Sequence, residues 1–182
     1  PGDGVPVSQP TTAFLSYDAK NLYVAFIAKD DPKLIRARVA KRKQILTDDR
    51  ITINIDTFHD HRHAYWFDVN PYAIQFDGVT TDGYGDDFSW EGRWDTQARI
   101  VADGYVVLIT IPFKTLRFND GVDTWRINFS RNNLKCNENS CWIPVPRAYN
   151  VATLAFTGQM IFDSAPRRSG PNVSLIPYVL GR

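Results

Sequence analysis

Alternation of apolar and polar residues with a period of two runs along most of this chain of 182 residues. Successive side chains of an extended strand point to opposite faces, so this period predicts strands with one apolar and one polar face. Many short strands separated by Gly-, Asn- and Asp-rich turns are typical of an antiparallel β-sandwich. We therefore expect an all-β fold with strands at residues 12–17, 21–28, 50–56, 64–70, 98–103, 104–113, 124–130, 141–145, 158–163 and 173–179.

Two segments leave other secondary structures open. Residues 32–44, PKLIRARVAKRKQ, fit either a helix or an edge strand, because Ile35, Ala37 and Val39 also alternate. Residues 112–118, PFKTLRF, are expected to hold one helical turn.

The overall composition limits the class of protein. With 43% hydrophobic residues, the chain can bury the core of one sizeable domain. Its 21 basic and 20 acidic residues nearly balance, which argues against nucleic-acid binding. No apolar run approaches the roughly 20 residues of a membrane-spanning helix. We expect one domain over residues 1–165, followed over 166–182 by a linker and the start of a further region. We also expect the chain to be a processed protein or a piece of a longer one.

The two cysteines, Cys136 and Cys141, lie in the segment CNENSC. Four intervening residues suit a small loop, so we predict a disulfide and with it an oxidising compartment. Two reduced thiols are the alternative. Zinc is disfavoured because no second Cys or His pair follows at ligand spacing.

Three histidines, His59, His61 and His63, alternate in the segment TFHDHRH. In a strand their imidazoles would point to one side, as a zinc or copper site needs. However, this segment separates two predicted strands, 50–56 and 64–70, where a hairpin loop belongs. We predict a polar hairpin tip rather than a metal site.

Three predicted strands each carry a polar face. If they pair within one sheet, these faces merge into a single patch that includes an aromatic ring, Trp66. Such a surface suits a sugar, whose hydroxyls bond to carboxylates, amides and guanidinium groups, although any half-solvated sheet has the same pattern. The residues concerned are Thr52, Asn54, Asp56, Trp66, Asp68, Asn70, Arg126, Asn128, Ser130 and Asn132.

Four segments in this order, 17–32, 48–71, 104–118 and 125–133, resemble the family 9 carbohydrate-binding module. They resemble most closely the version found at the N-terminus of large bacterial outer-membrane proteins. The resemblance runs from about Thr12 to Asp163. It implies a non-catalytic β-sandwich that binds saccharide ends, often with structural calcium, and a β-barrel after it. It also implies an earlier strand with a DG…W pattern, which is missing before Pro1.

The resemblance also implies where a sugar binds. In sugar-binding members two tryptophans sandwich the ligand, and Leu46 stands at the first position here, with Tyr149 or Asn150 near the second. The family's Glu, Arg and Gln fall on three residues of the polar face. Together with that face, the predicted ligand-binding residues are Thr52, Asn54, Trp66, Asp68, Ser130, Arg131, Arg147, Tyr149 and Asn150.

Calcium and haem are two further ligands that the sequence allows. Asp82, Asp86 and Asp87 lie in a Gly-rich loop and supply oxygen atoms that suit calcium, although a solvated acidic loop has the same composition. Haem would need Met160 with a histidine of residues 59–63, but a single Met in a strand is usually core filler. A second acidic group consists of Asp30, Asp31, Asp48 and Asp49.

No GxSxG, HExxH or phosphate-binding Gly motif occurs, so we do not expect an enzyme. The sequence predicts an extracytoplasmic carbohydrate-binding domain, of the periplasm or outer membrane. A structural or partner-docking periplasmic domain is the alternative. The resemblance implies that Trp94 is in the core, where the family has a buried aromatic residue, and we expect Tyr84 and Trp90 in an exposed loop.

Overall fold

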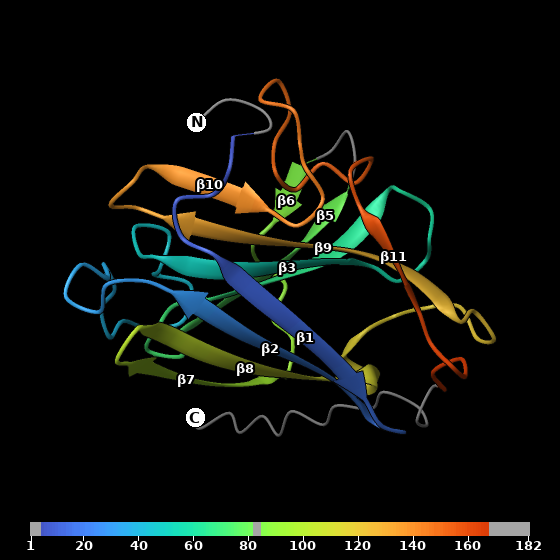
Figure 1. Cartoon of the computed structure of the whole chain (residues 1–182). Helices are drawn as coiled ribbons and strands as arrows, with labels where there is room; N and C mark the ends of the chain where they lie inside the picture. Colours follow the sequence, from blue (N-terminus) through green and yellow to red (C-terminus); the bar gives the residue numbers. More distant parts are fainter. Residues whose placement is uncertain (1–4, 82–84, 168–182) are drawn as a thin grey trace, which may run out of the picture.

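The computed structural model describes residues 5–81 and 85–167, which form two antiparallel sheets packed face to face (Figure 1). The predicted all-β sandwich is confirmed. The strands are β1 (Thr11–Tyr17), β2 (Asn21–Lys29), β3 (Arg50–Asp56), β4 (His63–Val69), β5 (Gln75–Thr81), β6 (Gly85–Asp87), β7 (Asp95–Val101), β8 (Gly104–Pro112), β9 (Thr124–Asn133), β10 (Glu138–Cys141) and β11 (Gly158–Ile161).

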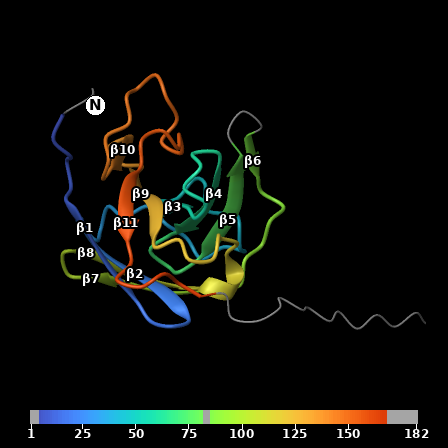
Figure 2. The same ribbon diagram turned by 90° about the vertical axis from the view of Figure 1, so that its right-hand side faces the viewer.

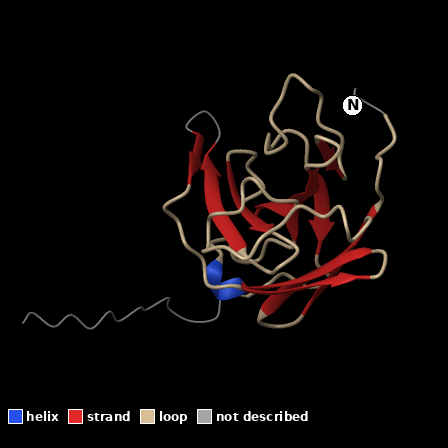
Figure 3. Ribbon diagram, turned by 90° about the vertical axis from the view of Figure 1, so that its left-hand side faces the viewer, coloured by secondary structure: helices blue, strands red, loops and turns tan. Residues whose placement is uncertain are grey.

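The two sheets differ in size. The small sheet has the order β1-β2-β8-β7, and the large sheet has the order β10-β9-β3-β4-β5-β6, with β11 also paired to β9. Figure 2 shows β1 at the edge of the small sheet on the same side of the sandwich as β10 and β11. One short helical turn, η1 (Phe113–Thr115), follows β8 as predicted (Figure 3).

The core lies between the sheets and follows the predicted alternation. Ile51, Ile53 and Ile55 of β3 are fully buried against residues of β2 and β8. Trp94 is buried as predicted, whereas Trp90 is half-buried with its ring centroid 5.0 Å from that of Tyr65, so its predicted exposure is wrong. Tyr84 lies outside the described residues.

Several segments depart from the predicted secondary structure. Residues 32–44 form turns and irregular chain, neither helix nor edge strand, and β10 ends where the strand predicted at 141–145 should begin. β5 was not expected, because Gly78 interrupts its pattern. A Cβ at Gly78 would lie 2.5 Å from Cζ2 of Trp66, so glycine is needed for the indole to cross this strand. Residues 173–179 lie outside the described part of the chain.

No helix among the described residues is long and apolar enough to cross a membrane.

Candidate binding site

The predicted polar face forms on the outer side of the large sheet. β9, β3 and β4 are neighbours there, and their register brings the polar residues into rows. Residues directly opposite each other share a face, so the three polar strand faces merge as predicted. The two central rows are Ser130, Thr52 and Asp68, and Asn128, Asn54 and Trp66.

Part of this face is covered by the chain itself. Asn128 is buried, and its Nδ2 donates to the carbonyl oxygens of Ile143 at 3.1 Å and Phe156 at 2.9 Å. Its Oδ1 accepts a hydrogen bond from the Ile143 backbone N–H. One amide thus ties both ends of the segment 142–157 to the sheet. Asn128 is therefore structural. Its neighbour Asn54 is buried, so it is not an exposed sugar contact as predicted.

Trp66 is buried instead of exposed. Only 7% of it is accessible, and its ring centroid lies 4.9 Å from that of Phe76 and 5.7 Å from that of Phe88. Ile45 joins the same cluster. This packing contradicts the expectation that the indole offers a free face for stacking. The alternation gave the correct face of the strand but not the chain that covers it.

The part of the face that the segment 142–157 leaves free centres on an ion pair. Nε of Arg50 lies 3.1 Å from Oδ2 of Asp68, and its Nη1 donates to the Leu46 carbonyl oxygen at 2.8 Å. Thr52, two residues after Arg50 on β3 and opposite Asp68 on β4, is half-buried. The sequence analysis missed Arg50, although the signal was present: it begins the alternation that continues through Thr52 on the same strand face.

The carboxyl group of Asp68 has a raised pKa. Burial raises the pKa of its carboxyl to about 6, against the lowering effects of the Arg50 charge and of a hydrogen bond from Thr52. Its other oxygen, Oδ1, is buried without a hydrogen-bond partner among the described residues. A buried acceptor without a partner is costly unless water or a ligand satisfies it. Asp68 thus has one oxygen paired with Arg50 and one buried oxygen, Oδ1, to which no described residue donates.

Exposed side chains border this face. Leu46 and Tyr149 are 55% and 56% exposed, and the ring of Tyr149 rests on Phe156 with centroids 5.2 Å apart. The predicted contacts Arg147 and Asn150 are also exposed in this segment, where Oδ1 of Asn150 accepts from the Ala152 N–H. Tyr149 therefore has the exposure that a stacking ring needs, as Trp66 does not.

Arg131 lies on the opposite side of β9, between the sheets. It is 3% exposed, its guanidinium pairs with Asp30, and it donates to the Lys29 carbonyl oxygen at 2.9 Å and to Oγ1 of Thr11 at 3.1 Å. Lys135 pairs with the same carboxylate. The prediction that Arg131 contacts a sugar on the polar face is therefore wrong: it links the two sheets.

The acidic residues considered for calcium bond to protein donors. Oδ2 of Asp48 accepts from Nδ2 of Asn70 at 2.8 Å, and Asp49 accepts from the N–H groups of Arg36 and Leu134. Asp31 accepts from the Lys33 N–H. No three His, Cys, Asp or Glu side chains within residues 5–81 and 85–167 are grouped as a metal site requires.

Only part of the Gly-rich acidic loop lies within the described residues. Asp82 lies outside the described residues. Asp86 accepts from Oγ1 of Thr80 at 2.6 Å, and Asp87 accepts from the N–H and hydroxyl of Ser89. Calcium there stays a prediction.

The histidine segment is a loop between β3 and β4, as predicted. The carboxylate of Asp56 accepts from the backbone N–H groups of Phe58 and His61, which curls the loop. Nδ1 of His63 lies 2.8 Å from Asp60, while Nδ1 of His61 lies 3.1 Å from the Leu154 carbonyl oxygen. The two rings therefore have different partners.

Both cysteines are free, which contradicts the predicted disulfide. Cys136 lies in the turn before β10, and Cys141 ends that strand opposite Ser130. An extended strand rises about 3.4 Å per residue, so β10 carries Cys141 beyond the roughly 7 Å Cα separation that a disulfide spans. The spacing suited a loop, but the residues between form a strand.

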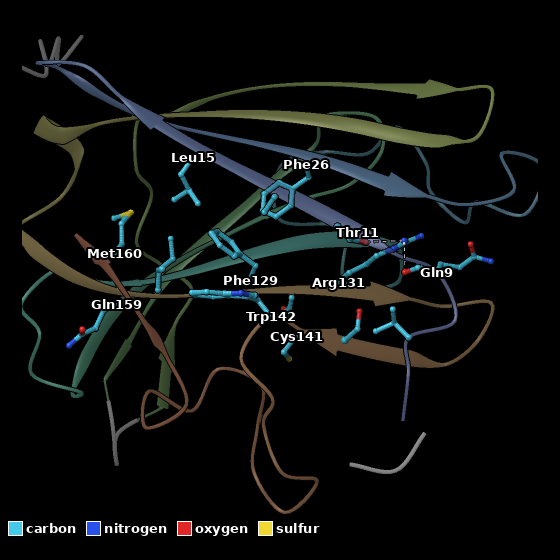
Figure 4. Close-up of a pocket in the computed structure, with 15 residues that line it drawn as sticks. Gln9, Thr11, Leu15, Phe26, Phe129, Arg131, Cys141, Trp142, Gln159 and Met160 are labelled. Atoms are coloured by element: carbon cyan, nitrogen blue, oxygen red, sulfur yellow. Dashed lines mark hydrogen bonds between the residues drawn. The ribbon is translucent and has the colours of Figure 1, made fainter. Parts of the chain in front are cut away.

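A hollow that was unexpected from the sequence lies between β1 and the edge formed by β9, β10 and β11. It has a volume of about 380 Å³. Leu15, Phe26 and Phe129 converge on it from the two sheets (Figure 4). Trp142 at its rim is 53% exposed and Leu15 is 42% exposed. We call this hollow the intersheet cleft.

Comparison with known proteins identifies the family. The model of the family described as "Carbohydrate family 9 binding domain-like" matches residues 8–139. The chain belongs to this family. No match is found among curated proteins.

Solved structures share its fold. A Bacteroides uniformis protein, provisionally named carbohydrate-binding, has a TM-score of 0.73 at 14% identity, over 90% of this chain and 85% of that one. A family 9 module of Caldicellulosiruptor kristjanssonii, solved with glucose and with cellotriose, has a TM-score of 0.60 at 18% identity in both structures. These cover 93% and 96% of this chain and 84% of theirs. At these identities the likeness concerns the fold.

Proposed function

We propose that this domain binds saccharides without catalysing their conversion, through the outer face of its large sheet. The observation that carries the proposal is the pair formed by Arg50 and Asp68, whose partly exposed guanidinium lies on a face bordered by the exposed ring of Tyr149. Membership of a carbohydrate-binding family supports it.

The ligand we propose is a neutral sugar such as glucose or the end of a glucan. A module of the same family has been solved with glucose and with cellotriose. Arg50 and Asp68 together carry no net charge when Asp68 is ionised, which suits a neutral polyol better than an anion. With Leu46 in place of a second stacking ring, we expect affinity weaker by about 1–3 kcal/mol than with two rings.

The wider setting is also proposed. The order of motifs resembles that of domains that precede outer-membrane barrels, so we place this domain outside the bacterial cytoplasm, within a larger protein. If calcium binds, Asp82, Asp86 and Asp87 are the residues proposed to hold it, with a role in loop rigidity.

A glycan array followed by titration calorimetry tests the proposal. The wild type, Asp68→Ala and a control, Asp103→Ala, are compared with calcium and with chelator. Asp103 is an exposed carboxylate paired with Lys29, in the turn between β7 and β8. We expect a glucan signal that Asp68→Ala removes and the control keeps. If the folded wild type gives no binding signal on any glycan of the array with calcium present, saccharide binding is refuted.

The intersheet cleft favours one other function, docking of a partner polypeptide. β1 forms one wall and is an edge strand of seven residues, TTAFLSY, without a charge or proline. Such an edge offers unpaired backbone groups to another extended strand. A synthetic peptide of alternating valine and threonine should then slow hydrogen exchange of the β1 amides. Unchanged exchange at saturating peptide would count against docking there.

A further inference from the structure

Arg50 and Asp68 are not equally accessible, although they form one pair. The side chain of Arg50 is 18% exposed and that of Asp68 is 6% exposed. Asp68 lies beneath, opposite Thr52 on the neighbouring strand and Phe76 on the other side. A ligand approaching the sheet therefore meets the guanidinium before the carboxylate.

One side of the guanidinium is fixed and the other is free. Nε is buried 3.1 Å from Oδ2 of Asp68, an ionic contact that is not a hydrogen bond, and Nη1 donates to the carbonyl oxygen of Leu46. Within residues 5–81 and 85–167, Nη2 has no hydrogen-bond partner, and it is not among the buried atoms that lack one. Nη2 therefore keeps accessible surface, while the ionic contact of Nε and the hydrogen bond of Nη1 orient the guanidinium.

We infer that Arg50 contacts the saccharide directly and that Asp68 is a positioning residue, which holds the guanidinium in the orientation that the ligand meets. This inference rests on the proposed function and assigns the roles within that site. A planar guanidinium offers parallel N–H donors to two neighbouring hydroxyl oxygens of a sugar ring. Its preorganisation by Asp68 and by Leu46 spares part of the entropy cost of binding.

These roles predict a pH profile. Asp68 loses its charge on mild acidification, because burial raises its pKa to about 6. Burial raises the pKa of Asp68, while the charge of Arg50 and a hydrogen bond from the neutral Thr52 lower it. As Asp68 becomes protonated below pH 6, the guanidinium loses its ionic support, and affinity should fall although Arg50 itself is unchanged.

The experiment is calorimetric titration with glucose and cellotriose at pH 5 and pH 8. It uses the wild type, Arg50→Ala, Arg50→Lys, Asp68→Asn and, as a control, Arg99→Ala, an exposed arginine on β7 of the other sheet. We expect Arg50→Ala to weaken binding at least tenfold and Arg50→Lys to retain part of it. Asp68→Asn should weaken binding severalfold at pH 8 and remove the pH dependence, while Arg99→Ala behaves as wild type.

Each alternative outcome is distinguishable. If the wild type binds and folded Arg50→Ala and Arg50→Lys bind equally well, the role of Arg50 is refuted while the proposed function stands. If Asp68→Asn keeps the wild-type pH dependence, Asp68 does not act through Arg50. A wild type that binds neither sugar refutes both the role and the function.

Discussion

The two faces of β9 lead to two different kinds of surface. On one face, Ile127 and Phe129 point into the intersheet cleft, where apolar side chains are incompletely packed. On the other, Asn128 joins the polar outer face, where its amide is bonded to the segment 142–157. A strand's alternation thus creates both surfaces, but the chain that covers each face decides what remains available.

The two surfaces suit different partners. The outer face keeps a charged pair with fixed donor directions, which recognises a ligand by its geometry. The cleft is lined by apolar side chains such as Leu15 and Phe129 beside the buried Arg131, and its open strand edge suits a less specific apolar occupant. Substitutions on the outer face and in the intersheet cleft can be made separately, and the stability and sugar binding of each variant then show whether the two surfaces differ in this way.

The largest effect is expected for Arg131→Met, on the cleft side. It leaves Asp30 buried with only Lys135 as an ionic partner. Breaking a buried pair from one side should lower the free energy of unfolding by about 3 kcal/mol, measured by urea denaturation. Sugar affinity should stay unchanged, because Arg131 does not reach the outer face. A loss of stability below about 1 kcal/mol would show that the pair does not link the sheets.

The next effect is expected for Asp68→Asn on the outer face, and it depends on pH. The folded-state pKa of Asp68, about 6, lies above its ordinary 3.8, so folding favours the protonated form. Its contribution to stability is full below pH 3.8 and is lost as pH rises through 6. The stability of Asp68→Asn relative to wild type should therefore rise by about 2–3 kcal/mol between pH 4 and pH 8.

Urea denaturation at both pH values measures this difference, with Asp103→Asn as a control on an exposed carboxylate. A flat difference would mean that Asp68 ionises in the folded protein as easily as in water.

The smallest effect is expected for Leu15→Ala in the cleft. Leu15 is 42% exposed, so its truncation should cost less than about 1 kcal/mol, against about 2–5 kcal/mol for a well-packed leucine. Leu22→Ala, at a residue 1% exposed on β2, is the matched comparison. Equal losses in thermal or urea unfolding would indicate that the cleft is already filled.

Much of the fold was predictable from local pattern. Alternation such as that of Ile51, Ile53 and Ile55 identifies a buried strand face without knowledge of its partners. β5 was missed because Gly78 removes the pattern at the point where Trp66 crosses the strand. The need for that glycine arises from a contact between two strands, which a local reading does not include.

The site was less predictable, for a related reason. Period-two reasoning correctly placed Trp66, Asp68 and Thr52 on one face, but burial depends on long loops whose paths are set by tertiary hydrogen bonds such as those of Asn128. Arg131 was assigned to the sugar although its own alternation places it on the core side. Arg50 was visible in the pattern and was overlooked.

Chemical-shift mapping with cellotriose tests the central claim most directly, because it compares the two surfaces in one spectrum. We predict the largest changes at the amides of Arg50, Thr52 and Asp68, with a further change at Tyr149. The indole N–H of Trp142 and the amide of Leu15 should not move. Shifts concentrated at Trp142 and Leu15 would place the sugar in the intersheet cleft and contradict the account.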